Sequence, residues 1–481
     1  MTSTSAAKEL RALADLINGA VEKIERACAS RSETYPLADD YITPQSEAVR
    51  MAPDVLELGN IIVAAAAQLI SAVRIPAVTL TISALTHYVP SCLRIAIACN
   101  ISEILREASP QGLHVSEIAS RAAVEPNKLA RCLRLLATNH IFREVSPDVF
   151  TNNRLSSLID TGKVVNEILK NPDEKYGGSS GIAAIMELMT DEGLKSSGWL
   201  PETIMDKVVG VSQEPNETSF NKAHDTQLSI FPWWELPGNA YRYKRFEVGM
   251  QGIQSRTSPG AIIEGYEWKD LPEGSVVVDV GAGTGSHSLV LAKAFGHLHF
   301  VVQDRAPVIA DAEKYWIAHY PEAVQSGRIN LQDWVWATAH DFFTPQPIKE
   351  PAVFLLRTIL HNWSDKYASK ILTELRAAAG PKTMLLIVDN AIEYACEDTT
   401  TARDILGASA SFPPKPLLAN NGVAGVLPYL MDLQMLALAN GYERTVAQFE
   451  KLLKECGWKL TRVFRVTGFE VGNSKLFAVP T

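Results

Sequence analysis

A glycine-rich turn in the second half of the chain is the clearest sign of chemistry. The apolar run VVVDV, residues 276–280, leads directly into GAGTG, and a segment with helical spacing, SHSLVLAKAF, follows. Glycine accepts positive φ values and lets a backbone approach a ligand where a Cβ would collide. We therefore expect a nucleotide-like ligand at Gly281, Gly283 and Gly285, although the G-x-G-x-G spacing departs from the G-x-G-x-x-G dinucleotide fingerprint.

Two acidic residues support this interpretation of the turn. Asp279 stands just before the glycines, and Asp304 closes the next apolar run, LHFVVQD. A carboxylate at the end of the second strand can accept hydrogen bonds from both hydroxyls of a ribose. The pair predicts a strand, turn and strand that bind a nucleoside.

A histidine and two further acids form the second candidate constellation. His361 follows the apolar run AVFLLRTIL, Asp389 closes TMLLIVD, and Glu443 lies in GYERT before a helix that Thr445 can cap. The carboxyl ends of parallel strands share one edge of a sheet, where such folds bind ligands. One imidazole with two carboxylates is suited to act as a general base with groups that orient it.

The elements that must position these residues alternate from about residue 266 onward. This alternation of strands and helices predicts a doubly wound α/β sheet. The expected strands are VVVDV, LHFVVQD, INLQDW, AVFLLRTIL, TMLLIVD and a final pair in KLTRVFRV and KLFAV.

The first third of the chain has helical spacing. Residues 5–30 predict an amphipathic helix, residues 30–47 a polar, proline-containing linker, and residues 52–106 an apolar helical region interrupted by Pro76 and Pro90. So much apolar helix needs a partner surface. Either an internal core or a dimer interface of exchanged helices would supply it.

Residues 114–156 have the pattern of a winged helix, with two helices and a two-stranded wing closing at an SPD turn. A DNA-binding module would place Lys128, Arg131 and Arg134 in a groove. Nearby glutamates and a formal net charge of −9 weigh against a nucleic-acid partner.

Residues 171–265 are less regular and rich in aromatic side chains. Five of these residues either wall a flat apolar pocket or pack helices onto the next domain. They are Phe231, Trp233, Trp234, Phe246 and Met250.

Composition limits the remaining possibilities. With 481 residues, 47% of them hydrophobic and 21% charged, the chain predicts a globular protein of more than one domain. The longest apolar run, IIVAAAAQLISAV, contains Gln68 and ends at Arg74, and the N-terminus lacks the apolar core of a signal peptide, so no membrane span is predicted. Six cysteines without C-x-x-C spacing predict neither disulfides nor zinc and favour a reducing, cytoplasmic location. They are Cys28, Cys92, Cys99, Cys132, Cys396 and Cys456.

Four motifs together resemble the caffeic-acid-type family of class I, S-adenosylmethionine-dependent O-methyltransferases, particularly its fungal members. They are HDFF at 340–343, LHNWSD around His361, the acid of LLIVD and the G-x-E-R-T block. The resemblance covers roughly residues 90–481. It implies a C-terminal Rossmann-like domain with a mostly parallel seven-stranded sheet, an N-terminal helical and winged-helix dimerisation domain, and a homodimer. The expected parts are an N-terminal helix and linker (1–50), the dimerisation domain (51–170), a substrate-pocket region (171–265) and the methyltransferase domain (266–481).

The resemblance also implies roles for individual residues and requires no metal. His361 becomes the general base, with Asp389 and Glu443 beside it. Cofactor contacts fall on Gly281, Gly283, Gly285, Asp304, Asp341, Phe342 and Arg357, the last where plant enzymes commonly carry lysine. Substrate contacts fall on Trp233, Met250, Asn362 and Met431.

The expected chemistry explains the need for a base. A phenol has a pKa of about 10, so forming the phenolate at pH 7 costs roughly 4 kcal/mol. A histidine titrating near neutrality can take this proton as methyl transfer begins, and the remaining rate comes largely from holding oxygen and carbon at attack distance.

Departures from the plant pattern leave the substrate open. Asn362 replaces an aspartate, and Ile253 replaces a histidine. Residues 411–430 form an insertion that is either a lid or pocket wall beside Met431 and Asp432 or a surface loop. A phenol, a polyketide and a flavonoid all suit an aromatic pocket. Some fungal proteins resembling this family are pericyclases, in which a cation such as Arg357 beside the sulfonium would steer a cyclisation. A third hypothesis is a non-enzymatic regulator that acts through the winged helix.

Overall fold

The computed structural model describes residues 3–108, 111–254, 260–322, 337–339, 341–398, 404–409, 412–466 and 474–481. The chain divides into two compact units. The helical unit comprises Met1–Met205, Ser219–Arg256 and Pro413–Val426, and the sheet unit comprises Asp206–Thr218, Thr257–Phe412 and Leu427–Thr481. The boundaries predicted at residues 50, 170 and 265 stay predictions. They did not anticipate that residues 206–218 belong to the sheet unit and residues 413–426 to the helical unit.

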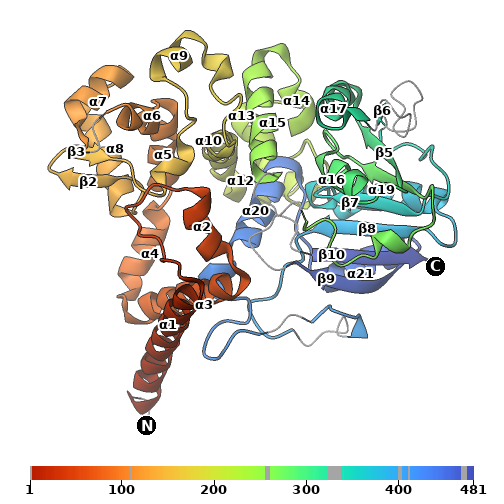
Figure 1. The fold of residues 1–481 in the computed structure, drawn as a ribbon, viewed down its shortest axis with the longest axis horizontal. Helices are drawn as coiled ribbons and strands as arrows, with labels where there is room; N and C mark the ends of the chain where they lie inside the picture. The colour runs from red at the N-terminus through yellow and green to blue at the C-terminus, as the bar shows by residue number, and fades with distance from the viewer. Residues whose placement is uncertain are drawn as a thin grey trace. The chain divides into compact units, whose positions relative to one another are not determined.

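The sheet unit contains a seven-stranded sheet in the order β6-β5-β4-β7-β8-β10-β9, and Figure 1 shows β7, β8, β10 and β9 in this succession. The first five strands are parallel, whereas β10 runs antiparallel to both neighbours. The strands are β4 (Val276–Val280), β5 (His299–Asp304), β6 (Ala337–Ala339), β7 (Val353–Arg357), β8 (Met384–Asp389), β9 (Trp458–Arg465) and β10 (Ser474–Pro480). The expected α/β fold with a mostly parallel sheet is confirmed. INLQDW, expected as a strand, lies outside the described residues.

Helices cover both faces of this sheet, as continuous apolar strands require. Leu289 of α16 and Trp316 of α17 pack with Val277 and Val302 on one face. The other face packs against α19 and α21. The helices are α16 (Ser286–Ala294), α17 (Ala306–His319), α19 (Asp365–Ala378), α20 (Leu427–Ala439) and α21 (Val446–Glu455). Chain order reverses direction at β4, so the carboxyl ends of β4 and β7 flank the switch point where such folds bind ligands.

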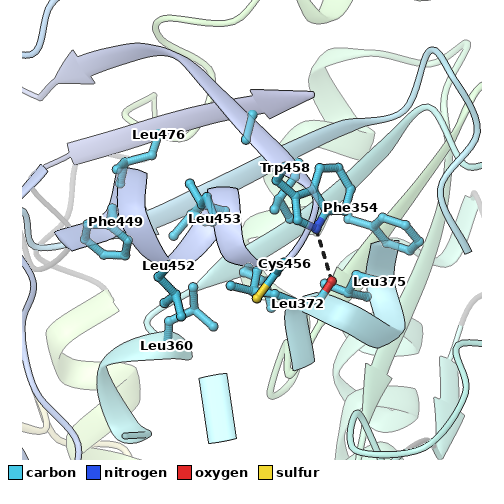
Figure 2. Packing of buried hydrophobic residues seen from close by; sticks show 14 of the residues in the cluster. Phe354, Leu360, Leu372, Leu375, Phe449, Leu452, Leu453, Cys456, Trp458 and Leu476 are labelled. Atoms are coloured by element: carbon cyan, nitrogen blue, oxygen red, sulfur yellow. Dashed lines mark hydrogen bonds between the residues drawn. The ribbon is translucent and has the colours of Figure 1, made fainter. Parts of the chain in front are cut away.

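The core behind this edge is shown in Figure 2. Leu360, which follows β7, belongs to the same buried cluster as Phe449 and Leu452 of α21. Trp458 is fully buried there, and its indole Nε1 donates a hydrogen bond of 3.0 Å to the Leu372 carbonyl of α19. The segment that carries the candidate histidine is thus anchored in the core one residue before it.

The helical unit begins with helices that the sequence predicted as one amphipathic segment and one apolar region. Leu13 of α1 packs against Ala64 and Ala65 of α3. Pro44, Pro53 and Pro76 each open a helix, in agreement with the preference of proline for the first turn. The elements are α1 (Ser3–Arg31), α2 (Pro44–Met51), α3 (Pro53–Val73), α4 (Pro76–Leu85), α5 (Tyr88–Ala98) and α6 (Ile101–Arg106).

The winged-helix pattern is confirmed. The helices α7 (Val115–Ala122) and α8 (Pro126–Thr138) precede a hairpin of β2 (Arg143–Ser146) and β3 (Val149–Thr151), with β1 (Leu113–His114) as a third strand. Arg134 pairs with Glu144 and Asp148 of the wing, so this arginine serves the module itself. The helices that follow are α9 (Val165–Lys170), α10 (Ile182–Leu188), α11 (Leu194–Ser197), α12 (Leu200–Ile204), α13 (Ser219–His224), α14 (Ile230–Trp234) and α15 (Ala240–Gln254).

Within the insertion at 411–430, whose expected role as a lid or pocket wall beside Met431 stays a prediction, residues 413–426 belong to the helical unit. Leu417 and Ala424 pack against α1 and α3, and Gln68 donates a side-chain hydrogen bond of 3.0 Å to the Pro416 carbonyl. The alanine-rich stretch of α3 leaves room for these side chains. The segment therefore extends the core of the helical unit, while Met431 lies on α20 in the sheet unit.

Candidate active site

The glycine turn after β4 adopts the conformation that its residues predict. Gly281, Gly283 and Gly285 have φ values of +71°, +59° and +73°. A Cβ at Gly285 would stand 2.8 Å from Nε1 of Trp316, so packing alone demands glycine there. Around Gly283, by contrast, no heavy atom of the described residues lies within 4 Å of a Cβ position. The turn thus presents bare backbone to an open space.

The acid at the end of β5 faces this turn. Oδ2 of Asp304 accepts the N–H of Gly283 at 2.8 Å, and Oδ1 accepts the N–H of Arg305 at 2.7 Å. Burial raises the pKa of Asp304, and both backbone hydrogen bonds oppose that rise. Each oxygen keeps a further lone pair for a ligand hydroxyl. Asp279 is held differently: its Oδ2 accepts the hydroxyl of Ser288 at 2.6 Å, and burial raises its pKa to about 6.

The candidate base lies on a single 3₁₀ turn, Leu360–Asn362, after β7. Nδ1 of His361 is 2.9 Å from Oε1 of Glu443, and the two residues are 8% and 1% exposed. Burial alone would lower the pKa of His361, but the Glu443 carboxylate outweighs it and raises the pKa above the usual histidine value. Because the carboxylate only accepts, Nδ1 carries the proton, which leaves Nε2 as the acceptor of the neutral ring.

Glu443 is itself held by two neighbours. Its Oε1 also accepts the amide of Asn390 at 3.0 Å, and its backbone N–H donates to Asp432 at 2.8 Å. Burial raises the pKa of Asp432. Asn390 was not predicted as a site residue, although it directly follows Asp389 at a strand end, which is the signal that would have identified it.

The second predicted acid behaves differently. Asp389 is 1% exposed, and within the described part of the chain neither of its carboxylate oxygens has a hydrogen-bond partner. Burial raises the pKa of Asp389 to about 7, against the opposing charge of His361. The structure therefore brings His361, Glu443 and Asp389 together, but only Glu443 contacts the imidazole by a hydrogen bond.

Comparison with known proteins identifies the family. Residues 206–408 match the O-methyltransferase domain, and residues 83–161 match the O-methyltransferase dimerisation domain. An O-methyltransferase of Armillaria gallica is 43% identical over 475 residues, covering 98% of this chain and 99% of the relative. The 4-O-methyltransferase 1 of Phanerochaete chrysosporium is 41% identical over 462 residues, covering 95% and 96%. This chain is an S-adenosylmethionine-dependent O-methyltransferase.

Solved structures confirm the fold of this O-methyltransferase. The mitomycin 7-O-methyltransferase MmcR aligns with a TM-score of 0.61 at 21% identity, covering 84% of this chain and 97% of that one. LepI in complex with S-adenosylmethionine aligns with a TM-score of 0.63 at 17% identity, covering 97% and 100%. A structure described as a pericyclic reaction enzyme also aligns, at 0.63 and 17%, covering 90% and 96%. At these identities the likeness concerns the fold alone.

The glycine turn of the O-methyltransferase fits its cofactor. The space before Gly283 is open, and the Asp304 carboxylate beside it suits a ribose. Phe342 lies close by, since a Cβ on Gly281 would be 3.6 Å from its Cε1. Arg357, at the end of β7, acts to lower the pKa of both Asp279 and Asp389, so its charge influences both the turn and the histidine site.

Two of the remaining predicted residues of the sheet unit make local hydrogen bonds, and the binding roles of all three stay predictions. Asp341 is exposed and accepts the N–H of Phe343 at 3.0 Å. Asn362 donates to the Thr358 carbonyl at 3.1 Å, so its amide stabilises the turn that carries the histidine. Met431 is half-buried on α20. His340 of the HDFF motif lies outside the described residues.

Two predicted substrate contacts belong to the helical unit. Trp233 is 8% exposed and packs edge to face against Phe220, with the guanidinium of Arg242 5.5 Å from its ring. Met250 is half-buried or less on α15. These contacts show packing, and substrate binding by both residues stays a prediction. Across the described residues, no group of three or more histidine, cysteine or acidic side chains is arranged to hold a metal ion.

Proposed function

We propose that this O-methyltransferase methylates a phenolic hydroxyl of an aromatic small molecule, with His361 as general base. The observation that carries the proposal is the buried 2.9 Å contact between Nδ1 of His361 and Glu443, at the carboxyl end of β7. A buried imidazole with one nitrogen tied to a carboxylate is oriented to accept a proton at the other. Ile359 of the same segment lies 2.5 Å from a Cβ position on Gly281, so the base is next to the cofactor turn.

The proton transfer follows from this geometry. The substrate O–H bond breaks as Nε2 of His361 takes the proton, and the resulting imidazolium is stabilised by Glu443 and by the charge of Asp389. The phenolate oxygen then becomes the nucleophile. S-adenosylmethionine, when bound, supplies an electrophilic methyl group. The chain offers Asp304 for the ribose of the cofactor, and Asp341 together with the aromatic ring of Phe342 for its adenine. The bare backbone at Gly281, Gly283 and Gly285 allows close approach.

The test is a methyl-transfer assay with labelled S-adenosylmethionine and a panel of phenols. Wild type should form a methyl ether and S-adenosylhomocysteine, and His361→Ala should lower kcat by about 10²- to 10⁴-fold, the usual contribution of general base catalysis. His319→Ala is the matched control, because this exposed histidine of α17 bonds only the Tyr315 carbonyl of its own helix among the hydrogen bonds seen. Undiminished turnover by His361→Ala would end the assignment of the base. Tight cofactor binding without turnover on any phenol would favour the pericyclic alternative.

We further propose that the protein is a homodimer whose interface includes α4. Each of the ten residues of α4 is exposed or only partly buried. Leu80 and Leu85 of this helix are 73% and 51% exposed, and Ile75 just before it is 67% exposed. This helix runs directly into residues 83–161, which match the dimerisation domain. A large exposed apolar surface continuous with such a domain fits a second copy of the chain.

Length and hydropathy alone would also allow a membrane. Two segments, Pro53–Val73 and Pro76–Ala98, are long and apolar enough to span one, which is weak evidence because core helices meet the same criterion. Light scattering separates the two possibilities. A detergent-free dimer that Leu80→Asp converts to monomer would support the proposal, whereas a wild-type monomer or a need for detergent would contradict it.

A further inference from the structure

The segment GYERT, residues 441–445, lies directly on the turn that carries the histidine. A Cβ on Gly441 would stand 2.1 Å from the His361 carbonyl oxygen and 2.6 Å from the carbonyl carbon of Asn362. Real Cβ atoms do not approach so closely, so only glycine fits here. The main chains of the two segments are therefore in contact at the point where Glu443 must reach the imidazole.

Arg444 joins the two segments by a fork of hydrogen bonds. Its Nη1 donates to the Leu360 carbonyl at 2.9 Å, and its Nη2 donates to the Trp363 carbonyl at 2.8 Å. These two carbonyls stand on either side of His361. A guanidinium can hold two acceptors in one fixed plane, which an ammonium group cannot do.

The guanidinium is wholly buried, which makes its presence informative. Arg444 is 0% exposed, and the carboxylate paired with it is Asp365, whose side chain is 53% exposed and accepts from Nε at 3.0 Å. A buried charge with so exposed a partner has a large desolvation cost, and an apolar side chain would fill the same space without it. The two hydrogen bonds that the guanidinium donates to the His361 turn explain why arginine stands here.

We propose that Arg444 is a positioning residue that holds the His361 turn at the distance from Glu443 required for proton transfer. The inference rests on the proposed role of His361 as base. Glu443 is the residue before Arg444, so the fork and the 2.9 Å Nδ1–Oε1 contact span the same two segments. Loss of the fork lets the turn move, and with it the imidazole, while the cofactor turn after β4 keeps its own contacts.

The test is Arg444→Lys, compared with Arg376→Lys. Arg376 also donates to two carbonyls, those of Gly457 and Thr481, but at the far end of α19 from the site. Arg444→Lys should lower kcat about a hundredfold, the loss typical of a 1 Å misplacement. Binding of S-adenosylhomocysteine, measured by calorimetry, should be unchanged, and Arg376→Lys should keep the wild-type kcat.

The pH profile separates positioning from a merely structural role. The charges that act on His361 are Glu443 and Asp389, which raise its pKa, and Arg444, which lowers it. Lysine keeps the positive charge, so a changed pKa reports the lost contact with Glu443. Burial of the imidazole then lowers its pKa, and the acid limb of the pH profile of kcat should move to lower pH. An Arg444→Lys enzyme with the acid limb of the wild type and a wild-type kcat per folded molecule would overturn the proposal.

A second variant and a second readout keep the outcomes distinct. Asp365→Ala removes the exposed carboxylate that accepts from Nε of Arg444 and from the hydroxyl of Tyr442, but it leaves both carbonyl contacts of the fork in place. It should therefore shift the acid limb in the same direction by less. Titration of His361 by NMR of ¹⁵N-histidine-labelled protein measures the same pKa without turnover. If His361→Ala retains activity but the His361 pKa still falls in Arg444→Lys, the base assignment fails and the positioning role stands. An unchanged pKa in both variants contradicts the positioning role.

Discussion

The cofactor turn and the histidine site lie at the ends of adjacent strands but are built in opposite ways. Between Val276 and Asp304 the turn, its helix and its acid form one continuous stretch of 29 residues. The histidine site joins residues that are 82 positions apart, His361 and Glu443, with Asn390 between them in sequence. A local motif depends on backbone conformation, whereas an assembled site depends on long-range hydrogen bonds between buried polar groups. The two should therefore fail in different ways when they are altered.

Glu443→Gln should have the largest effect, because it attacks the assembled site at its centre. A glutamine amide can donate to Nδ1 of His361 and thus favour the tautomer that leaves Nε2 protonated and unable to accept. Loss of the orienting carboxylate beside a catalytic histidine lowers kcat by about 10³- to 10⁴-fold in comparable sites. Steady-state kinetics should show this loss with cofactor affinity intact. A parallel loss of cofactor affinity would mean that the two regions are not independent.

Gly283→Ala alters the local motif and should instead weaken cofactor binding. Gly283 and Gly274 both have positive φ, +59° and +76°, and in both cases a Cβ would meet no heavy atom of the described chain within 4 Å. The backbone strain is thus matched, at about 1–2 kcal/mol for each variant. Only Gly283 faces the cofactor space, so calorimetry should show affinity for S-adenosylhomocysteine reduced by about 5- to 150-fold, from an overpacking cost of 1–3 kcal/mol. Equal affinities of Gly283→Ala and Gly274→Ala would contradict the cofactor assignment.

The same contrast explains how much the sequence alone could predict. The glycine turn, the winged helix and six of the seven expected strands follow from local periodicity and turn residues, and the structure confirms them, whereas INLQDW lies outside the described residues. The placement of His361, Asp389 and Glu443 at one sheet edge was expected from the residues, and their roles followed from the family resemblance, but the spacing did not show that Glu443 is the acid that bonds the imidazole. The position of Asn390 at a strand end was a signal that could have been used, but the partners of Asn390 and Arg444 were missed because hydrogen bonds 53 to 84 positions apart leave no periodic signal.

Packing between distant segments was the other weak point of prediction. The insertion at residues 411–430 was expected to form a lid or pocket wall beside Met431, and that role stays a prediction, but the packing of Leu417 and Ala424 against α1 and α3 was not anticipated. These apolar residues match a surface some 350 positions away, and a proline-rich insertion gives no sign of this. Asp389 was expected to orient the histidine. The buried carboxylate without a hydrogen-bond partner in the described chain could be seen only once the contacts were known.

Asp389→Asn should show that the assembled site is a source of instability. The pKa of Asp389 is raised from 3.8 to about 7 in the folded protein. Between these values the folded state binds more protons than the unfolded state, so stability falls as pH rises from about 4 to 7 and then levels off. The asparagine variant lacks this loss. Its Tm should therefore exceed that of wild type at pH 8 by more than at pH 5, while kcat falls by about tenfold with the lost charge near the imidazolium. An equal Tm difference at both pH values would contradict the raised pKa of the buried Asp389.

Trp458→Phe should have the smallest effect, because this core residue belongs to neither the cofactor turn nor the histidine site. This indole lies in the core behind Leu360, and the variant loses one hydrogen bond to the Leu372 carbonyl together with some buried volume (Figure 2). The expected cost is about 1–3 kcal/mol in the free energy of unfolding, measured by chemical denaturation. Because core packing anchors the turn at Leu360 while Arg444 and Glu443 hold it at His361, kcat per folded molecule should stay at the wild-type value. A lower kcat with an unchanged free energy of unfolding would mean that the core, and not the fork of Arg444, sets the position of the base.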